Sequence, residues 1–518
     1  GSYILRMDQP YSRMVDMLLD TQYYSTNDPR PYDDTGWTLG PLRNVNTVRL
    51  TDTAILKSPM TLVSAPARAT GAIDGGDAAK LYIVDATAEP AIATLRFRLH
   101  DVAMSAAEDA FEVDGQKFHA GALLIKPASD ARGRLESAAK ELGLRVHGTA
   151  AEVSVAQHGV DVPRIALLHT WTTTQNEGWF RLMLEEARVP YTYISDQTVR
   201  TTPDLKQVFD VILYPPGPVD VARVLRGVPR RMLPDGRDAG GAIPWKKSEL
   251  TPSFGDGPDQ TDDIRGGLGL DGAANLQRFV ENGGLFIPIA GNASLPITLG
   301  MTEGVSIATT RQLQARGAVL NADVADRKSP IAYGYDDHLG VYFNQAPVFR
   351  VSVTGDVGGF GGGGSEQEAR TSGRGSVTDP DIPQGRPWNP PEAEPKRSKV
   401  EQETHVDPDI REFAPSAVLP KELWPRVVLR FATEKSLWAS GMLAGGGELA
   451  ETPAVVDVPV GRGHVVLFAI NPMWRQETQG SFMLVMNAAL NWDHLAAGWK
   501  APAEGATPAT KTAGGAEE

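Results

Sequence analysis

Four residues that could take part in chemistry follow one short apolar run. The run is Ile165–Leu168, and His169, Trp171, Asn176 and Glu177 come shortly after it. A histidine near a carboxylate can transfer protons, and a tryptophan can line a groove for a sugar or a peptide. A histidine at a strand end is also commonly a hydrogen-bonded structural residue, so both roles stay open. The sequence predicts a binding crevice here and leaves a hydrolase built on His169 and Glu177 as an alternative.

The residues around this run predict a β-α-β unit. The run itself is long enough for one buried strand, and apolar residues, including Trp179, recur at helical spacing over 177–188. Asn176 is a suitable N-cap for that helix, and the runs 191–194 and 209–214 predict two more strands. Such a unit implies a parallel sheet with right-handed crossovers, in which ligands sit at the carboxyl ends of the strands. We therefore expect His169, Trp171 and the helix start to meet at one edge.

Two further candidates, Trp474 and Arg475, follow another predicted strand over 464–470 and are expected at the same edge. Free N–H groups and the helix dipole at Glu177 favour an anion, and Arg475 would reinforce that preference. One hypothesis is a small anionic or polar ligand, such as a peptide carboxylate, bound weakly and without turnover. The alternative is an internal ion pair between Arg475 and Glu177.

Metal chemistry is not supported by the histidines. The chain has nine, and none is followed three residues later by a glutamate. A catalytic zinc needs three protein ligands and an open position for water. The pair His405 and Asp407 lies in a low-complexity stretch, where an accidental spacing explains it. We expect no metal site and no cofactor in this chain.

Composition narrows the class of protein. A chain of 518 residues should form two to four domains. Its 50 basic and 64 acidic residues give a net charge of −14, which argues against a nucleic-acid partner. There is no cysteine, so disulfides and thiol nucleophiles are excluded. No apolar run has the length of a membrane span, and we expect no membrane partner.

Four regions are expected along the chain. A mixed α/β region, with a strand over 46–50, covers 1–160, and the parallel-sheet α/β domain covers 161–353 plus 412–497. The stretch 354–411 is rich in Gly and Pro and predicts an exposed insertion, whose Lys396–Lys399 cluster should be solvated. The tail 498–518 is expected to be disordered. Asp33 and Asp34 could form an acid/base pair, but we predict that they cap a short helix.

Several long stretches resemble large bacterial zinc carboxypeptidases of the carboxypeptidase A-like metallopeptidase family. RMDQPYSRMVDMLLDTQYY and PYDDTGW resemble the segment after the catalytic domain of those proteins. RIALLHTWTTTQNEGW, SPIAYGYDDHLGVYFNQ and GRGHVVLFAINPMWRQETQGSF resemble a later domain, similar to class I glutamine amidotransferases. The resemblance covers most of 1–350 and 415–495. It implies a flavodoxin-like α/β fold, an upstream peptidase domain that holds the zinc, and secretion or a periplasmic location for the parent protein.

The catalytic groups that the resemblance implies are missing from this chain. The peptidase family takes its zinc ligands from an H-x-x-E pair and a distant histidine, and neither the pair nor an H-E-x-x-H occurs here. The amidotransferases use a cysteine on a sharp turn after a central strand. The matching turn follows 285–290 and reads Gly291, Asn292, Ala293, Ser294. Ser294 has no G-x-S-x-G context and is expected to be a cap or a polar loop residue.

Three functions therefore stay open. The first is a non-catalytic accessory portion of a zinc carboxypeptidase-family protein, which scaffolds the peptidase domain or binds substrate, with that domain as its partner. The second is an independent module that binds a peptide or a carbohydrate. The third is a hydrolase of unrecognised type. The residues expected to line the binding crevice of this chain are His169, Trp171, Asn176, Glu177, Asn292, Trp474 and Arg475.

Overall fold

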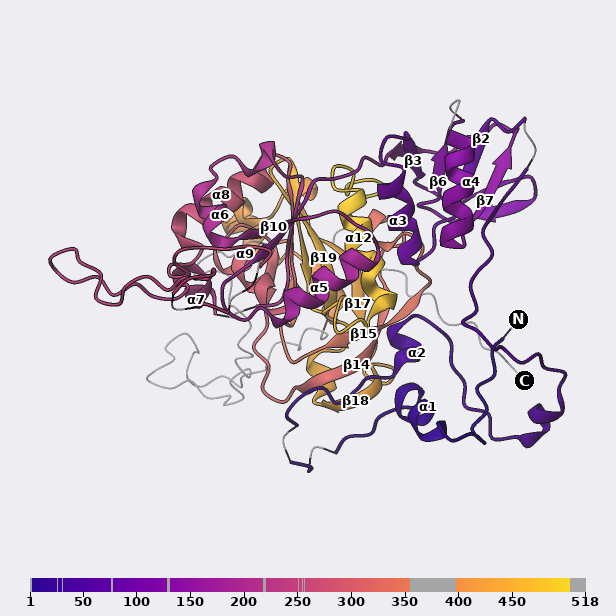
Figure 1. The fold of residues 1–518 in the computed structure, drawn as a ribbon. Helices are drawn as coiled ribbons and strands as arrows, with labels where there is room; N and C mark the ends of the chain where they lie inside the picture. Colours follow the sequence, from indigo (N-terminus) through magenta and orange to yellow (C-terminus); the bar gives the residue numbers. More distant parts are fainter. Residues whose placement is uncertain are drawn as a thin grey trace, which may run out of the picture.

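The chain folds into a mixed α/β structure with two large sheets (Figure 1). The computed structural model describes residues 2–503, apart from 26, 30, 76–77, 128–130, 218–219, 250, 254, 256 and 355–396. Most of the predicted insertion and the end of the predicted tail thus lie outside the described residues.

The larger sheet has ten strands, and its first five are parallel. Their order across the sheet is β10-β9-β11-β12-β20. These strands are almost entirely buried, because helices cover parallel sheets on both faces and the strands are accordingly continuous apolar runs. The bounds are β9 (Ile165–His169), β10 (Thr192–Ser195), β11 (Val211–Tyr214), β12 (Leu285–Pro288) and β20 (Gly463–Phe468). The predicted parallel arrangement of strands is confirmed.

The other half of this sheet is antiparallel, which the sequence did not predict. It continues from β20 through β19, β17, β14 and β15, and β18 also pairs with β14. β20 is the junction, since it pairs in parallel with β12 and antiparallel with β19. The bounds are β14 (Gln314–Val324), β15 (His338–Phe343), β17 (Arg426–Phe431), β18 (Trp438–Ala444) and β19 (Pro453–Val460).

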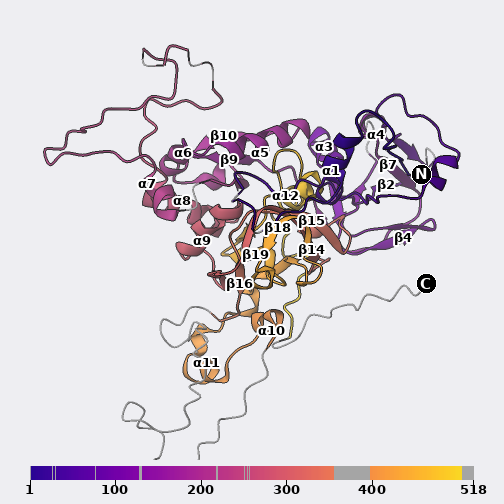
Figure 2. The same cartoon turned by 90° about the horizontal axis from the view of Figure 1, so that it is seen from below.

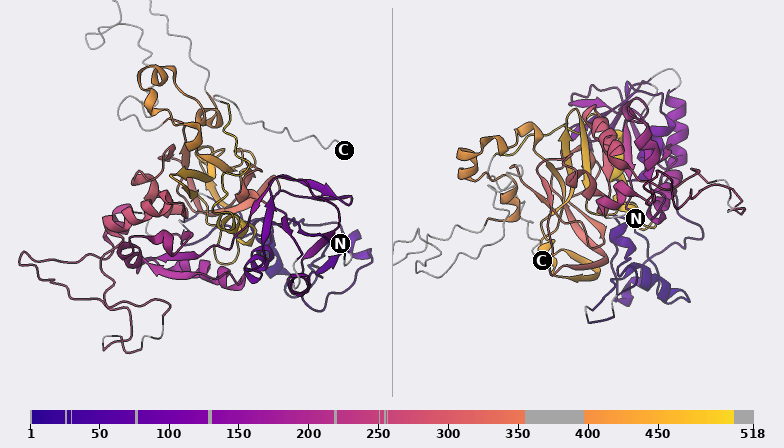
Figure 3. Two further views of the ribbon diagram at one scale, coloured as in Figure 1. Left: turned by 90° about the horizontal axis from the view of Figure 1, so that it is seen from above. Right: turned by 90° about the vertical axis from the view of Figure 1, so that its left-hand side faces the viewer.

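The helices around the parallel strands include α5, which carries Glu177. Helix α8 packs against α6, β12 and β20, and α12 is buried at every residue because it lies between the large sheet and α3. A long loop between α7 and α8 extends away from the body (Figure 3). The bounds are α5 (Gln175–Glu186), α6 (Asp196–Thr201), α7 (Val221–Arg226), α8 (Gly269–Glu281), α9 (Ser294–Thr298) and α12 (Phe482–Leu490).

The smaller sheet stands beside the α/β body and has the strand order β1-β7-β2-β6-β3-β8. Its bounds are β1 (Ala72–Asp74), β2 (Leu81–Val84), β3 (Met104–Ala107), β6 (Leu123–Ile125), β7 (Arg145–Thr149) and β8 (Gln157–Gly159). Helices α3 (Pro90–Arg98) and α4 (Ala131–Leu142) accompany it. The hairpin predicted at Asp114-Gly115 is confirmed between β4 (Phe111–Val113) and β5 (Gln116–Phe118).

The described end of the predicted insertion forms two helices, and the expected solvation is wrong for Lys399, whereas Arg397 is exposed as expected. Helices α10 (Lys399–Glu403) and α11 (Pro408–Phe413) stand at the edge of the body near β16 (Figure 2). The Lys399 ammonium donates to the carbonyls of Gly447 and Ala450 at 2.8 and 2.7 Å, and Glu403 pairs with Arg430 at 2.6 Å. These partners lie far away in sequence, which is why composition alone could not identify them.

Short elements complete the fold. A two-stranded sheet pairs β13 (Val305–Ile307) with β16 (Phe349–Val351). The 3-10 helices are η1 (Thr53–Lys57), η2 (Leu205–Gln207), η3 (Ala290–Ala293), η4 (Pro330–Ala332), η5 (Pro415–Ala417), η6 (Lys421–Leu423), η7 (Gly446–Glu448) and η8 (Gln479–Ser481).

Residues 20–45, here called the N-terminal strap, pack on the larger sheet rather than on the smaller one. The backbone N–H of Gln22 donates to Ser440 Oγ at 2.8 Å, and that of Gly36 donates to the Gly317 carbonyl at 2.9 Å. Helix α1 (Ser12–Leu19) directly precedes the strap, and helix α2 (Leu39–Leu42) lies near its C-terminal end. The strand predicted over 46–50 is wrong, because these residues follow the strap along the surface without a pairing partner.

The close approach at Gly36 provides a test of the strap. A Cβ atom there would lie 2.7 Å from the Ser440 carbonyl oxygen, which is a backbone atom and cannot rotate away. We expect Gly36→Ala to lower the free energy of unfolding by roughly 1–3 kcal/mol and to open residues 20–45 to proteolysis. Gly133→Ala, in α4 with nothing within 4 Å of the added Cβ, is the control: it should raise the free energy of unfolding by roughly 0.5–1 kcal/mol, through helix propensity, and leave residues 20–45 protected from proteolysis. If residues 20–45 of Gly36→Ala stayed as resistant to proteolysis as in the unchanged chain, the packing of the strap on the larger sheet would be contradicted.

Candidate functional site

His169 lies at the centre of an aromatic and acidic cluster at the carboxyl ends of β9, β10 and β11. Its ring stacks on Tyr193, with centroids 4.1 Å apart and planes 7° apart, and meets the edge of Trp171 at 4.9 Å. Its Nε2 is 2.9 Å from Asp259 Oδ2, and its Nδ1 is 3.3 Å from the Thr170 carbonyl oxygen. Burial lowers the pKa of His169 although Asp259 opposes that change. Because both ring nitrogens are engaged, this histidine is not placed to take a proton from a substrate.

Glu177 faces the same cluster from the first turn of α5. Its side chain is buried and accepts a hydrogen bond from the Tyr193 hydroxyl. Burial raises the pKa of Glu177 to about 8, against the opposing effects of Tyr193 and Arg181. The Arg181 guanidinium, one turn further along α5, lies 5.0 Å from the centre of the Tyr193 ring. At neutral pH, Glu177 is therefore predominantly protonated and Arg181 remains the nearest cation.

Asp196 and Tyr214 complete the cluster, and sequence reasoning missed both. Asp196 is the first residue of α6, directly after β10, and burial raises its pKa to about 7. The Tyr214 hydroxyl ends β11, and burial together with nearby Asp196 and Glu177 raises its pKa. Neither Asp196 Oδ1 nor the Tyr214 hydroxyl has a hydrogen-bond partner among the described residues. We name these seven residues the strand-end cluster: His169, Trp171, Glu177, Tyr193, Asp196, Tyr214 and Asp259.

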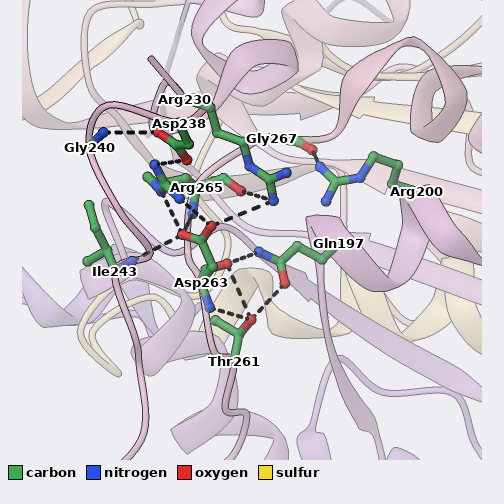
Figure 4. Close-up of polar contacts among 10 residues, drawn as sticks. All are labelled: Gln197, Arg200, Arg230, Asp238, Gly240, Ile243, Thr261, Asp263, Arg265 and Gly267. Atoms are coloured by element: carbon green, nitrogen blue, oxygen red, sulfur yellow. Dashed lines mark hydrogen bonds and ion pairs between the residues drawn. The ribbon is translucent and has the colours of Figure 1, made fainter. Parts of the chain in front are cut away.

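The loop between α7 and α8 holds Asp259 over this cluster. Near the base of the loop, Asp263 accepts from Arg265 Nε and Nη2 at 2.8 Å each, and Arg265 also pairs with Asp238 (Figure 4). Gln197 of α6 donates to the Asp263 carbonyl at 2.7 Å. These contacts fix the loop base against α6, so that Asp259 reaches His169 from outside the sheet.

Asn176 and Trp179 are not part of the strand-end cluster. Helix α5 begins two residues earlier than predicted, at Gln175, with Thr174 as its N-cap. Asn176 is therefore inside the helix, and its side-chain oxygen accepts from Asn471 Nδ2 at 3.3 Å. Trp179 packs beside Trp474 on the opposite side of α5.

Arg475 and Trp474 form a different cluster, and the predicted ion pair with Glu177 is wrong. Arg475 Nη2 is 2.6 Å from Asp33 Oδ2, and its Nη1 is 3.1 Å from Asp34 Oδ2. The Trp474 indole N–H donates to Asp34 at 2.8 Å, and the Tyr342 hydroxyl donates to it as well. The prediction that Asp33 and Asp34 cap a helix is also wrong, because their carboxylates bind groups more than 300 residues away in sequence. We call Asp33, Asp34, Tyr342, Trp474 and Arg475 the strap anchor.

Asn292 lies at the turn after β12 and is almost completely buried. Its Nδ2 donates to the Pro215 carbonyl at 2.5 Å, which ties this turn to the end of β11. Ser294 donates to the Gly291 carbonyl at 2.7 Å, as expected of a polar residue in a turn. The strained position of this turn is Ala290, whose φ is +49°. An alanine side chain has no group that could act as a nucleophile.

Metal ligation and membrane insertion receive no support from the described residues. Within that part of the chain, no three His, Cys, Asp or Glu side chains come together as metal ligands could. None of the helices that the structure describes has both the length and the apolar character of a bilayer span.

The raised pKa of Glu177 predicts a pH-dependent stability. The folded chain keeps this proton up to about pH 8, whereas the unfolded chain loses it near 4.5, so the free energy of unfolding falls as pH rises between these values. We expect Glu177→Gln to remove up to about 1.4 kcal/mol per pH unit of this decline, measured by urea unfolding across the window. His169 contributes with the opposite sign and is not altered. Glu185→Gln, an exposed site on the same helix, is the control, and an equal effect there would contradict the assignment.

A double-mutant cycle distinguishes the observed partners of Arg475 from the one predicted. Breaking a pair that includes the 8% exposed side chain of Asp34 should couple Arg475→Gln to Asp34→Asn by about 1–3 kcal/mol. Arg475→Gln and Glu177→Gln should be additive, because no contact joins these side chains. Both cycles are read as free energies of urea unfolding, and coupling only in the second cycle would contradict the strap anchor.

Comparison with known proteins gives little further guidance. No protein-family model matches this chain, and no curated protein sequence matches it. A cytoplasmic protein from Salmonella typhimurium is 11% identical, covers 63% of this chain and 97% of its own, and has a TM-score of 0.29. A ThuA-like protein from Bacteroides uniformis is 9% identical, covers 67% and 95%, and has a TM-score of 0.28. A beta-galactosidase from Bacillus circulans sp. alkalophilus is 10% identical, covers 63% and 30%, and has a TM-score of 0.27. Likenesses at these TM-scores carry no argument about activity, substrate or partner.

Proposed function

We propose that this chain is a non-catalytic accessory portion of a zinc carboxypeptidase-family protein and that it scaffolds the peptidase domain. The proposal starts from the resemblance of the stretches quoted above. According to this proposal, the zinc is bound by the peptidase domain, and the parent protein is secreted or periplasmic. The observation that carries the scaffolding role is a set of apolar side chains exposed on both flanks of the N-terminal strap.

Among the described residues, more than half of the exposed large apolar side chains lie on these flanks. Although α1 has an apolar face, none of its residues is buried. Tyr11 is 68% exposed and Leu62 is 90% exposed. The exposed set is Tyr3, Ile4, Leu5, Met7, Tyr11, Met14 and Met17 before the strap, and Val45, Val48, Leu50, Leu56, Met60, Leu62 and Val63 after its packed part. Extended apolar surface of this kind marks a site of protein interaction.

The strap gives these flanks a defined position. Because residues 20–45 are bound to β14, β15 and β18 and to the strap anchor, the segments on either side leave the larger sheet at fixed points. A folded domain that covers both flanks would thus be held in one orientation relative to the α/β body. This is what a scaffold requires, and it needs no reacting group.

The parallel strands support a flavodoxin-like, amidotransferase-like fold for the α/β domain. When β9, β10, β11, β12 and β20 are numbered 1 to 5 in chain order, their order across the sheet is 2-1-3-4-5. This is the flavodoxin-like strand order. In the fold relatives, the nucleophile occupies the sharp turn after a central strand. Here Ala290 occupies the strained position after β12, and there is no cysteine. Both facts favour a domain retained for its shape.

The test uses the protein extended by its upstream coding sequence, which should contain an H-x-x-E motif. Burial of each Met side chain is worth roughly 1.5–3 kcal/mol, so Met14→Asp with Met17→Asp should weaken docking by roughly 3 kcal/mol or more. We expect hydrogen exchange over 2–19 and 46–63 to be slow in the extended protein and fast in the variant.

Leu270→Asp, at a 76% exposed position of α8, is the matched control and should leave exchange unchanged. If hydrogen exchange of both flanks were as fast in the extended protein as in the present chain, the proposed scaffolding role would be overturned.

A further inference from the structure

We propose that His158 is a pH switch at the junction between the smaller sheet and the α/β body, and that the junction loosens when the ring loses a proton. His158 is the middle residue of β8, at the edge of the smaller sheet, and is 7% exposed. Its Nε2 lies 2.8 Å from Asn491 Oδ1, directly after α12 of the body. Its Nδ1 lies 3.1 Å from Glu108 Oε1, directly after β3 of its own sheet. This inference does not rest on the scaffolding function, because none of these residues belongs to the strap or its flanks.

The contacts of Asn491 determine the first proton that the ring must carry. Asn491 Nδ2 donates to the Asn487 carbonyl at 2.8 Å, one turn earlier in α12, so the amide oxygen of Asn491 faces the ring. The reversed amide would place that oxygen against a carbonyl oxygen, and neither of the two can donate. Asn487 itself donates to the Tyr333 carbonyl at 2.8 Å, which fixes the position of α12 on the body. In contact with Asn491, His158 Nε2 must therefore donate.

Glu108 determines the second proton. A carboxylate oxygen only accepts, so one proton has to lie between Nδ1 and Glu108 Oε1 in addition to the proton on Nε2. When this proton is lost, a ring lone pair faces the carboxylate. If β8 separates from α12, the neutral ring can carry its proton on Nδ1, donate to Glu108 and leave Nε2 to water. A neutral His158 therefore favours separation, and a doubly protonated His158 favours contact with Asn491.

The neighbouring groups do not supply the missing proton. The other titratable and charged groups around His158 are Asp109 after β3, its partner Lys328, Tyr333 after η4, and Asp493 and His494 after α12. The His494 ring stacks on His158 with centroids 4.8 Å apart, so a charge on His494 would repel the doubly protonated His158. Burial raises the pKa of Tyr333, whose hydroxyl thus stays neutral. His494 opposes the switch and cannot replace it.

Hydrogen exchange of the full chain at about pH 5.5 and about pH 8.5 tests the switch, because protein histidines commonly titrate in this range. Rates are divided by the intrinsic exchange rate at each pH, so that they report the opening of β8. We expect the amides of β8 and Val160 to be roughly 10- to 100-fold less protected at the higher pH, since one buried hydrogen bond between charged groups is lost. Glu108→Gln should remove this difference, because a glutamine can either accept from Nδ1 or donate to it. His158→Gln should remove it as well. Glu108 has a 25% exposed side chain, so its variant reports on the switch even if His158→Gln fails to fold.

His147→Gln is the matched control. His147 also lies between two carboxylates, at 3.2 Å from Asp74 and 3.0 Å from Asp114, but it is in β7 and does not contact the body. It should leave the pH difference at β8 unchanged, and so should His494→Gln. Equal protection of β8 at both pH values in the unchanged chain, or a difference that persists in Glu108→Gln, would overturn the proposal. Loss of the difference in His147→Gln or His494→Gln would overturn it too, because another histidine would then be the switch.

Discussion

The carboxylate of Asp34 is the constraint on which the arrangement of this chain depends. Its side chain is 8% exposed, and burial raises its pKa while Tyr342 and Trp474 oppose the change. A buried carboxylate is tolerated only when charged or polar donors surround it, and here they come from β15 and from the loop after β20. The strap can therefore leave the sheet only by giving up all three donors at once. This interaction holds the strap on the sheet between its contacts at Gln22 and Gly36.

The same interaction engages the guanidinium that the sequence predicted beside Glu177. Arg475 follows β20 and could have neutralised Glu177, but its guanidinium is committed to Asp33 and Asp34. The cluster keeps Glu177, Asp196 and Asp259, with Arg181 beside the Tyr193 ring as the nearby cation. Burial then shifts the two inner carboxyls toward their protonated forms, although Arg181 opposes the change at Glu177 and Arg200 opposes it at Asp196. A site with this balance disfavours the anionic ligand that the start of α5 alone would suggest.

The sequence predicted those parts of the fold that depend on local patterns. Continuous apolar runs identified β9, β10, β11, β12 and β20, and the Asp-Gly pair identified the β4–β5 hairpin. Pairing between distant segments had no local signal. Nothing in the sequence near Asp34 indicates Tyr342, and nothing in the Gly- and Pro-rich stretch around Asp259 indicates His169. Asp196 could have been found, since it directly follows a predicted strand beside the one that ends at His169.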